Sequence, residues 1–213
     1  MGCASVTRPI EPFPLVLRHN EWTRMTNESR VLYEWIALRC QAQEPGAFED
    51  LIVAMERPLL YYAIALTGSQ DRALDVLQDA WLRVFRSIGK LKEPGALKPW
   101  LYSVVHGIAV DRIRRSASRE QAEAAHVVDF QEAEEPLFAE EDAGAIHEAL
   151  SQIGLRHREV LVLHFLEDLP VAEIAAIVGC SEGTVKSRLH YAKKAMKQIL
   201  QGVNHGTQRR DSA

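Results

Sequence analysis

Apolar residues recur three and four positions apart along most of the chain, a spacing that places them on one face of a helix. No segment alternates apolar and polar residues as a half-buried strand would. Four helices are expected in the first half of the chain, separated by breaks that contain Pro or Gly. They cover residues 29–43, 48–66, 71–88 and 100–115, with a basic loop at 89–99. The apolar side of the third expected helix is lined by Leu74, Leu77, Trp81, Val84 and Ile88. The pattern therefore predicts an all-α protein.

The clearest pattern lies between Pro170 and Lys194 and predicts two consecutive helices. The first has apolar residues at helical spacing, namely Val171, Ile174, Ala175 and Val178. Gly179 then suits the left-handed conformation that ends a helix, and Ser181 is expected to cap a second, longer helix with Glu182 in its first turn. The apolar side of this helix carries Val185, Leu189, Ala192, Met196 and Ile199, and its other side is basic. This arrangement predicts a DNA-binding helix-turn-helix; the alternative is an ordinary helical hairpin with a solvated basic side.

The loss of helical periodicity divides the chain into two expected helical domains. The segment after Ser116 is acidic, rich in Ala, Glu and Gln, and contains Pro136. We expect a flexible, self-repelling linker there; a frayed acidic helix is the alternative. The expected divisions are a disordered leader at 1–28, domains at 29–116 and 143–201, the linker at 117–142 and a disordered tail at 202–213. Translation from Met25 is an alternative explanation for the leader.

Composition narrows the functional classes without identifying a catalytic site. The net charge of −4 comes largely from the acidic linker, so a basic face on the last helix remains compatible with nucleic-acid binding. Three widely separated cysteines, with no zinc-ligand spacing, are typical of a reduced cytoplasmic protein. No apolar run is long enough to span a membrane. No nucleophile triad, phosphate-binding loop or metal-ligand cluster is present in the pattern, so we predict no catalytic residue, metal or cofactor.

Three motifs together resemble the bacterial RNA polymerase sigma factors of the extracytoplasmic-function (ECF) type. The first is DRALDVLQDAWLRVF at 71–85, which is similar to the family's D-x-x-Q-[DE] run followed by an aromatic residue, Leu and Arg. The second joins Trp100-Leu101-Tyr102 to the DRIRR sequence at 111–115. The third is EIA at 173–175 followed by GTVKSRL at 183–189. The resemblance implies that the first domain is sigma region 2 and the second is sigma region 4.

The resemblance implies that the third expected helix binds core RNA polymerase. Its polar side is acidic and flanked by arginines, which suits charge-assisted bonds to a basic partner helix. The alternative is a solvated helix face. The residues implied in polymerase binding are Asp75, Gln78, Asp79, Arg83 and Arg86.

The basic loop and the fourth expected helix are implied in binding the −10 promoter element. Lysines attract phosphates, and aromatic rings stack on unpaired bases. Trp100 lies on the apolar stripe, so Tyr102 is expected to be the more exposed of the two. The implied set is Lys90, Lys92, Lys98, Tyr102, His106, Arg112, Arg114 and Arg115. At His106-Gly107 the family often has Arg-Asn, which puts the usual −10 contacts at these two positions in question.

The second helix of the helix-turn-helix is implied in binding the −35 element. Residues near the start of such a helix reach base edges, and later lysines meet phosphate. Thr184 and Ser187 have helix packing as an alternative role. The implied set is Ser181, Glu182, Thr184, Lys186, Ser187, Arg188, His190, Lys193 and Lys194.

The sequence therefore predicts an ECF-type sigma factor that binds core polymerase and directs promoter-specific initiation without being an enzyme. Core polymerase and promoter DNA are the implied partners, and the resemblance adds an anti-sigma factor as a regulatory partner. The rival hypothesis is a two-domain helix-turn-helix regulator that binds operator DNA without joining the polymerase. Such a regulator would bind duplex DNA alone and dimerise over a palindrome.

Overall fold

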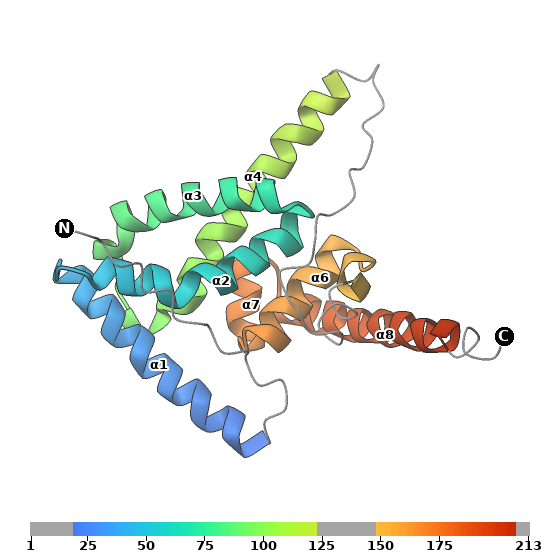
Figure 1. The fold of residues 1–213 in the computed structure, drawn as a ribbon, viewed down its shortest axis with the longest axis horizontal. Coiled ribbons are helices and arrows are strands. Elements are labelled where there is room, and N and C mark those ends of the chain that lie inside the picture. The colour runs from blue at the N-terminus through green and yellow to red at the C-terminus, as the bar shows by residue number, and fades with distance from the viewer. Residues whose placement is uncertain (1–18, 123–147, 208–213) are drawn as a thin grey trace, which may run out of the picture.

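The computed structural model describes residues 19–122 and 148–207, with side chains at 30–116 and 148–201. All its regular elements are helical, and no strand occurs within these ranges, which confirms the all-α prediction (Figure 1). The elements are α1 (His19–Gln41), α2 (Ala47–Thr67), α3 (Gln70–Ser87), η1 (Ile88–Lys90), η2 (Pro94–Ala96), α4 (Leu97–Ala122), α6 (Leu155–Leu161), the π-helical η3 (Val162–Leu166), α7 (Val171–Val178) and α8 (Glu182–Thr207).

Helices α1 to α4 form an N-terminal bundle in which α2 packs against α1, α3 and α4. Leu51, Met55 and Leu59 of α2 recur at steps of four and are fully buried. This spacing places all three on one side of the helix, so burial of a single apolar stripe holds the bundle together. The second and third expected helices are found within one residue of their predicted bounds.

The basic loop is more structured than the sequence pattern indicates. Two short 3₁₀ turns, η1 and η2, lie within it, and α4 begins at Leu97, before Trp100. The Leu97 side chain is fully buried and anchors this start. Pro99 is tolerated because the first turn of a helix leaves its N–H groups without intrahelical partners.

Three helices extend beyond their predicted ends. Helix α1 begins at His19, about three turns before its first predicted residue, whereas α4 continues to Ala122 and α8 to Thr207. Backbone hydrogen bonding continues a helix past the last apolar residue, so hydrophobic periodicity underestimates its length. The expected leader up to residue 18, most of the expected linker and the end of the tail lie outside the described residues.

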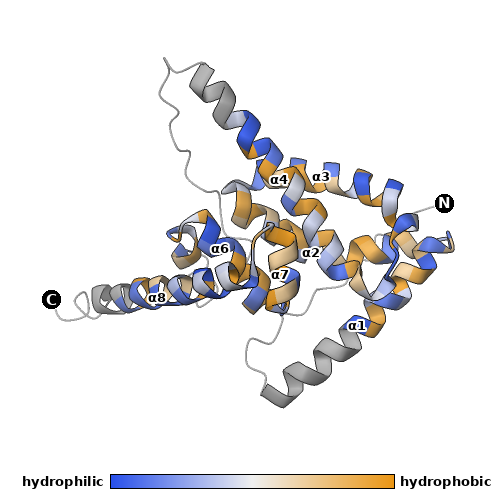
Figure 2. Cartoon of the chain, turned by 180° about the vertical axis from the view of Figure 1, so that it is seen from behind, coloured by the Kyte–Doolittle hydropathy of each residue, from blue (hydrophilic) through white to orange (hydrophobic). Residues whose placement is uncertain are grey.

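The C-terminal segment, residues 148–207, packs directly on the N-terminal bundle. Helix α7 contacts α4, and α6 contacts α2. Figure 2 shows α7 as a mostly hydrophobic helix between the bundle and α8. Buried side chains of both parts belong to one hydrophobic cluster, which includes Leu59 and Tyr102 of the bundle and Leu163 and Ile174 of the C-terminal segment. The two helical domains expected from sequence thus share one hydrophobic cluster in this structure.

Candidate polymerase and nucleic-acid interfaces

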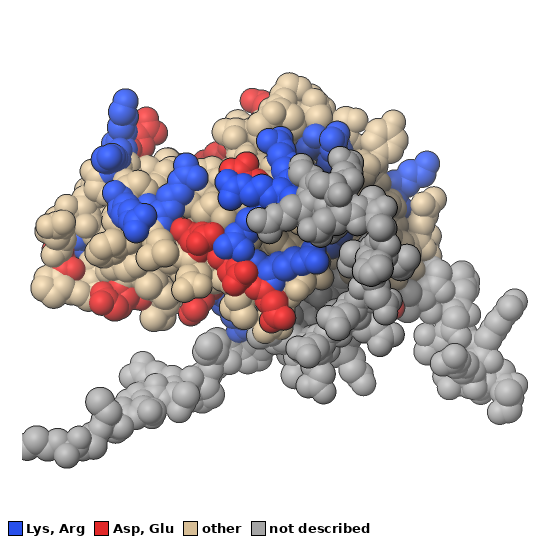
Figure 3. Space-filling view, turned by 90° about the horizontal axis from the view of Figure 1, so that it is seen from above, with Lys and Arg blue, Asp and Glu red and all other residues tan. Residues whose placement is uncertain are grey.

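The outer side of α3 presents the predicted acidic and polar residues to solvent. Asp75, Gln78 and Asp79 are exposed, as are Arg83 and Arg86. Helix α3 buries its other side through Ala73, Val76, Leu77, Ala80 and Val84. Figure 3 shows acidic side chains forming a band between basic ones on the face seen from above, the side of Figure 1 on which α3 lies. The helix therefore offers a charged surface to a partner.

The two aspartates of this surface already share an intramolecular partner. Arg112 of α4 donates hydrogen bonds to Asp79 Oδ2, at 2.5 Å from Nη2, and to Asp75 Oδ2, at 3.1 Å from Nη1. Hydrogen bonding to Asp79 is the main cause of the raised pKa of Arg112, which therefore stays charged. Arg112 was predicted to grip DNA phosphate; in this structure it orients the acidic face of α3.

Apolar side chains beside the acidic surface were missed by the sequence analysis. Leu74, Leu82 and Phe85 are exposed, and Phe85, at 66% exposure, packs edge-to-face on Phe48 with ring centroids 5.1 Å apart. The sequence pattern placed Leu74 on the buried side of α3, which is wrong because the buried stripe is centred on Val76 and Ala80. A protein-binding surface needs apolar area as well as charge, and these side chains supply it.

The predicted −10 residues divide into an exposed group and a covered group. Lys90, Lys92, Arg114 and Arg115 are exposed. Lys98 and His106 are half-buried, and each faces a carboxylate of the C-terminal segment. A Cβ at Gly107 would meet no atom within 4 Å, so packing does not require glycine at this position.

The prediction that Tyr102 is more exposed than Trp100 is wrong. Tyr102 is fully buried and lies edge-to-face on Tyr62, with ring centroids 5.3 Å apart, whereas Trp100 is half-buried. Leu101, Tyr102 and Val105 share the buried side of α4, and Trp100 lies about 100° to 160° away around the helix from them. The helical phase of α4 therefore turns the tyrosine, and not the tryptophan, inward.

The helix-turn-helix has the predicted geometry. Helix α7 ends at Gly179, whose φ of 68° is left-handed, and Cys180 N–H donates to Ala175 O at 3.1 Å. Ser181 Oγ accepts from the Thr184 amide at 3.2 Å and thereby caps α8. Val185, Leu189 and Ala192 bury the inner side of α8, as the spacing indicates. The turn and cap signals of the sequence are confirmed.

Most predicted −35 residues are exposed on one side of α8. They are Ser181, Glu182, Thr184, Lys186, Ser187, His190, Lys193 and Lys194. Arg188 is the exception, because it is half-buried and donates to Glu159 Oε1 at 2.9 Å. Thr184 Oγ1 lies 2.9 Å from Ser181 Oγ and so belongs to the helix cap. The exposed side carries Lys186, Lys193 and Lys194, so it is suited to binding a polyanion.

Removing the Ser181 cap provides a first test of this geometry. Ser181→Ala deletes the acceptor of the Thr184 amide, and we expect the free energy of unfolding to fall by about 1 kcal/mol. Ser181→Asp keeps an acceptor at the cap and should remain close to the unaltered protein. Urea denaturation followed by circular dichroism measures both changes. Equal effects of the two substitutions would contradict a capping role.

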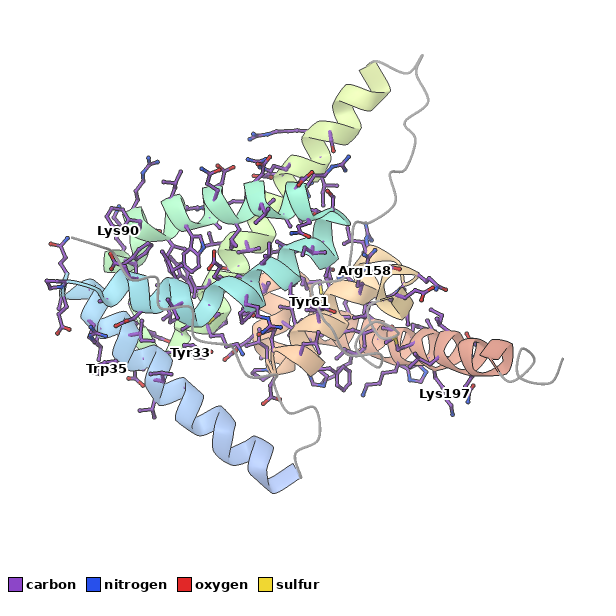
Figure 4. The ribbon with its side chains drawn as sticks, viewed as in Figure 1. Tyr33, Trp35, Tyr61, Lys90, Arg158 and Lys197 are labelled. Atoms are coloured by element: carbon purple, nitrogen blue, oxygen red, sulfur yellow. The ribbon has the colours of Figure 1, made fainter. Side chains whose placement is uncertain are left out.

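Among the side chains at 30–116 and 148–201, no three His, Cys, Asp or Glu residues are grouped so as to hold a metal ion. No helix in the described part of the chain is both long and apolar enough to cross a membrane. An apolar groove, also missed from sequence, lies between η3 and α8 and is bordered by Lys193 and Lys197. Figure 4 labels Lys197 on α8.

Comparisons with known proteins agree with the order of the motifs. The model of Sigma-70 region 2 matches residues 51–119, and that of Sigma-70, region 4 matches residues 143–196. The sigma factor SigL of Mycobacterium tuberculosis is 34% identical over 145 residues, which are 66% of this chain and 81% of SigL. The sigma factor SigV of Bacillus subtilis is 30% identical over 135 residues, which are 63% of this chain and 80% of SigV.

Solved structures share the fold. The sigma factor RpoE of Bartonella quintana, determined in complex with the anti-sigma factor NepR, aligns with a TM-score of 0.65 at 22% identity over 73% of this chain and 98% of RpoE. CnrH, determined in complex with the cytosolic domain of CnrY, aligns with a TM-score of 0.56 at 20% identity over 80% of this chain and 97% of CnrH. With the sequence relatives, these matches establish that the chain belongs to the RNA polymerase sigma factors of the ECF type, which direct transcription initiation.

Proposed function

We propose that the three surfaces divide the work of a sigma factor as the sequence motifs imply. The outer side of α3 binds core polymerase, the loop after α3 and the helix α4 hold the −10 strand, and α8 enters the major groove of the −35 element. The observation that carries this division is the exposed basic side of α8, which begins at a capped N-terminus after a tight turn. Such a helix presents its first turns to base edges.

The proposed polymerase surface combines charge with apolar area. Asp75 and Asp79 are held side by side by Arg112, and Leu82 and Phe85 extend the same helix with exposed apolar groups. A basic partner helix could exchange its own cations for Arg112 while covering the apolar groups. This supports α3 as the docking helix.

The chemistry of initiation belongs to the polymerase in this proposal, and the chain itself is not an enzyme. It acts in the cytoplasm, where core polymerase and the chromosome are found. An anti-sigma factor is proposed as a regulatory partner, because the two aligned sigma structures were determined as complexes, one of them with a named anti-sigma factor. Membership of the sigma family does not favour the rival regulator that acts apart from the polymerase.

Substitutions along α8 separate base reading from phosphate binding. Lys186→Ala should lower discrimination between the preferred −35 sequence and a scrambled one by about 5- to 150-fold, or about 1–3 kcal/mol, because Lys186 is near the start of the helix. Lys194→Ala should weaken binding to both sequences alike and reduce the salt slope by about one. Each variant loses one positive charge, so each is the control for the other.

The first measurement is transcription reconstituted from core polymerase and this protein on genomic fragments, which maps the promoter. The second is the binding of each variant to the −35 sequence of that promoter and to a scrambled one. We expect promoter-specific RNA only when the protein is present. Absence of specific RNA from every fragment would refute the proposed function, and equal discrimination by the two variants would refute the assignment of Lys186.

A further inference from the structure

Tyr191, which was missed by the sequence analysis, is a large aromatic side chain on the outer side of α8. It is 59% exposed. It lies about one turn after Ser187 and one turn before Lys194, both of which are exposed on the proposed −35 surface. The buried side of α8 at this level is formed by Leu189 and Ala192. The phenol ring therefore faces solvent on a surface that is proposed to meet DNA.

Two histidines flank this ring, and they come from different helices. His190 is its neighbour on α8, with ring centroids 5.5 Å apart and an interplanar angle of 81°. His157 belongs to α6, and its ring centroid lies 6.5 Å from that of Tyr191. Helix α6 packs against α8, as Figure 1 shows. His157, Tyr191 and His190, here called the His–Tyr patch, thus extend the surface of α8 onto α6.

Exposed cations accompany the two imidazoles. Lys186 and Lys194 lie four residues before and after His190 on α8, and both are exposed. Arg156, which precedes His157 on α6, is exposed as well. The patch therefore lies in a positively charged part of the surface, which favours an anionic ligand.

The carboxylates of α6 and α8 are paired elsewhere. Among the side chains described at 30–116 and 148–201, the histidine that faces a carboxylate is His106, at 3.4 Å from Glu159. Glu159 also accepts from Arg188 at 2.9 Å, and Glu182 lies 4.0 Å from Lys186. A protonated imidazole of the His–Tyr patch is thus left to an external anion.

The elements packed on α6 and α8 leave this charge balance unchanged. Burial raises the pKa of Glu173 on α7, and the nearby Arg30 and Lys98 of the bundle oppose this rise, so this carboxyl group faces the bundle. Helix α2 brings Tyr61 close to Arg158 of α6 (Figure 4). The groups that face the patch are therefore cationic or neutral.

DNA phosphate has the chemistry that these three side chains can bind. Imidazole changes its charge between about pH 5 and pH 8, and both of its ring nitrogens donate when it is protonated. A tyrosine hydroxyl also donates to phosphate oxygens. Phosphate backbones border a helix that lies in the major groove, and contacts to them position a protein without reading sequence. A patch at the edge of α8 is placed for such contacts.

We propose that His157, Tyr191 and His190 bind DNA phosphate and that protonation of the two histidines is coupled to this binding. The proposal rests on the −35 assignment of α8 made above. An imidazole beside a phosphate holds its proton more tightly than in the free protein, because the negative charge favours the charged form. Binding therefore takes up protons, and duplex DNA of any sequence is bound more tightly as the pH falls.

The test measures the affinity of the full-length protein for a short random-sequence duplex at about pH 8 and about pH 6, at constant ionic strength. The unaltered protein should bind about 10- to 100-fold more tightly at the lower pH. His157→Gln and His190→Gln should each reduce this ratio by about 3- to 10-fold. His164→Gln is the control, because His164 is half-buried with Nδ1 3.3 Å from Leu169 O, and it should keep the full ratio.

Equal pH ratios in the two patch variants and the His164 control would overturn the proposal. Calorimetry of the unaltered protein in two buffers of different ionisation enthalpy provides a measurement that needs no substitution. Proton uptake on binding near neutral pH is expected, and its absence would also overturn the coupling. Failure of the proposed function would appear differently, as absence of promoter-specific RNA while pH-dependent duplex binding persists.

Tyr191→Phe tests the tyrosine separately from the histidines. It keeps the ring and deletes the hydroxyl donor, so duplex affinity should fall by about 2- to 10-fold at both pH values. The ratio of the two affinities should stay the same, because both imidazoles remain. Unchanged affinity would refute the contact between Tyr191 and phosphate.

Discussion

Replacing both Asp75 and Asp79 with arginine is expected to weaken binding to core RNA polymerase by at least about 30-fold, which corresponds to about 2 kcal/mol. The two carboxylates are exposed on α3 and lie next to the apolar groups Leu82 and Phe85, so they are placed to meet a basic partner. Reversal of both charges turns attraction into repulsion. Binding of labelled protein to core polymerase, without DNA, measures the change.

Arg112→Ala is the control for this double variant. It breaks the same intramolecular pairs while leaving both aspartates available. Exposed ion pairs contribute about 1 kcal/mol or less, so binding should stay within about fivefold of the unaltered protein. If Arg112→Ala weakened binding as much as the double variant, orientation of α3 would be the cause, and the direct contact would be refuted.

Leu163→Ala is expected to lower the free energy of unfolding by about 2–5 kcal/mol. The Leu163 side chain is 0% exposed and belongs to the cluster shared by the bundle and the C-terminal segment, so truncation leaves a cavity that the surrounding helices fill only in part. Urea denaturation followed by far-ultraviolet circular dichroism measures the loss.

Leu166→Ala makes the same chemical change three residues later in η3. Leu166 is 43% exposed, so we expect a loss of about 1 kcal/mol or less. The difference between the two losses of unfolding free energy separates the effect of burial from the intrinsic effect of replacing leucine with alanine. Similar losses at the two positions would contradict the burial of Leu163 in a shared core.

The motifs that were predicted well are local ones. Gly179 and Ser181 act on their own neighbours, through a left-handed stop and a side-chain cap, so a single stretch of sequence contains all the information needed to locate the turn. The exposure of Asp75 and Asp79 is also determined locally, because helical spacing separates them from the apolar stripe of α3. Periodicity misplaced Leu74, since an apolar residue at the border of a stripe belongs equally well to either side.

The sequence by itself determined the helices, the helix-turn-helix and the order of motifs that marks a sigma factor, because these depend on interactions between residues a few positions apart. Only the tertiary structure decided that Tyr102 is buried, and that Lys98, His106 and Arg188 face Glu167 and Glu159. These contacts join residues 29 to 69 positions apart along the chain. The periodicity of one helix specifies which side is buried, but the helix that covers it is chosen by the packing of the whole chain.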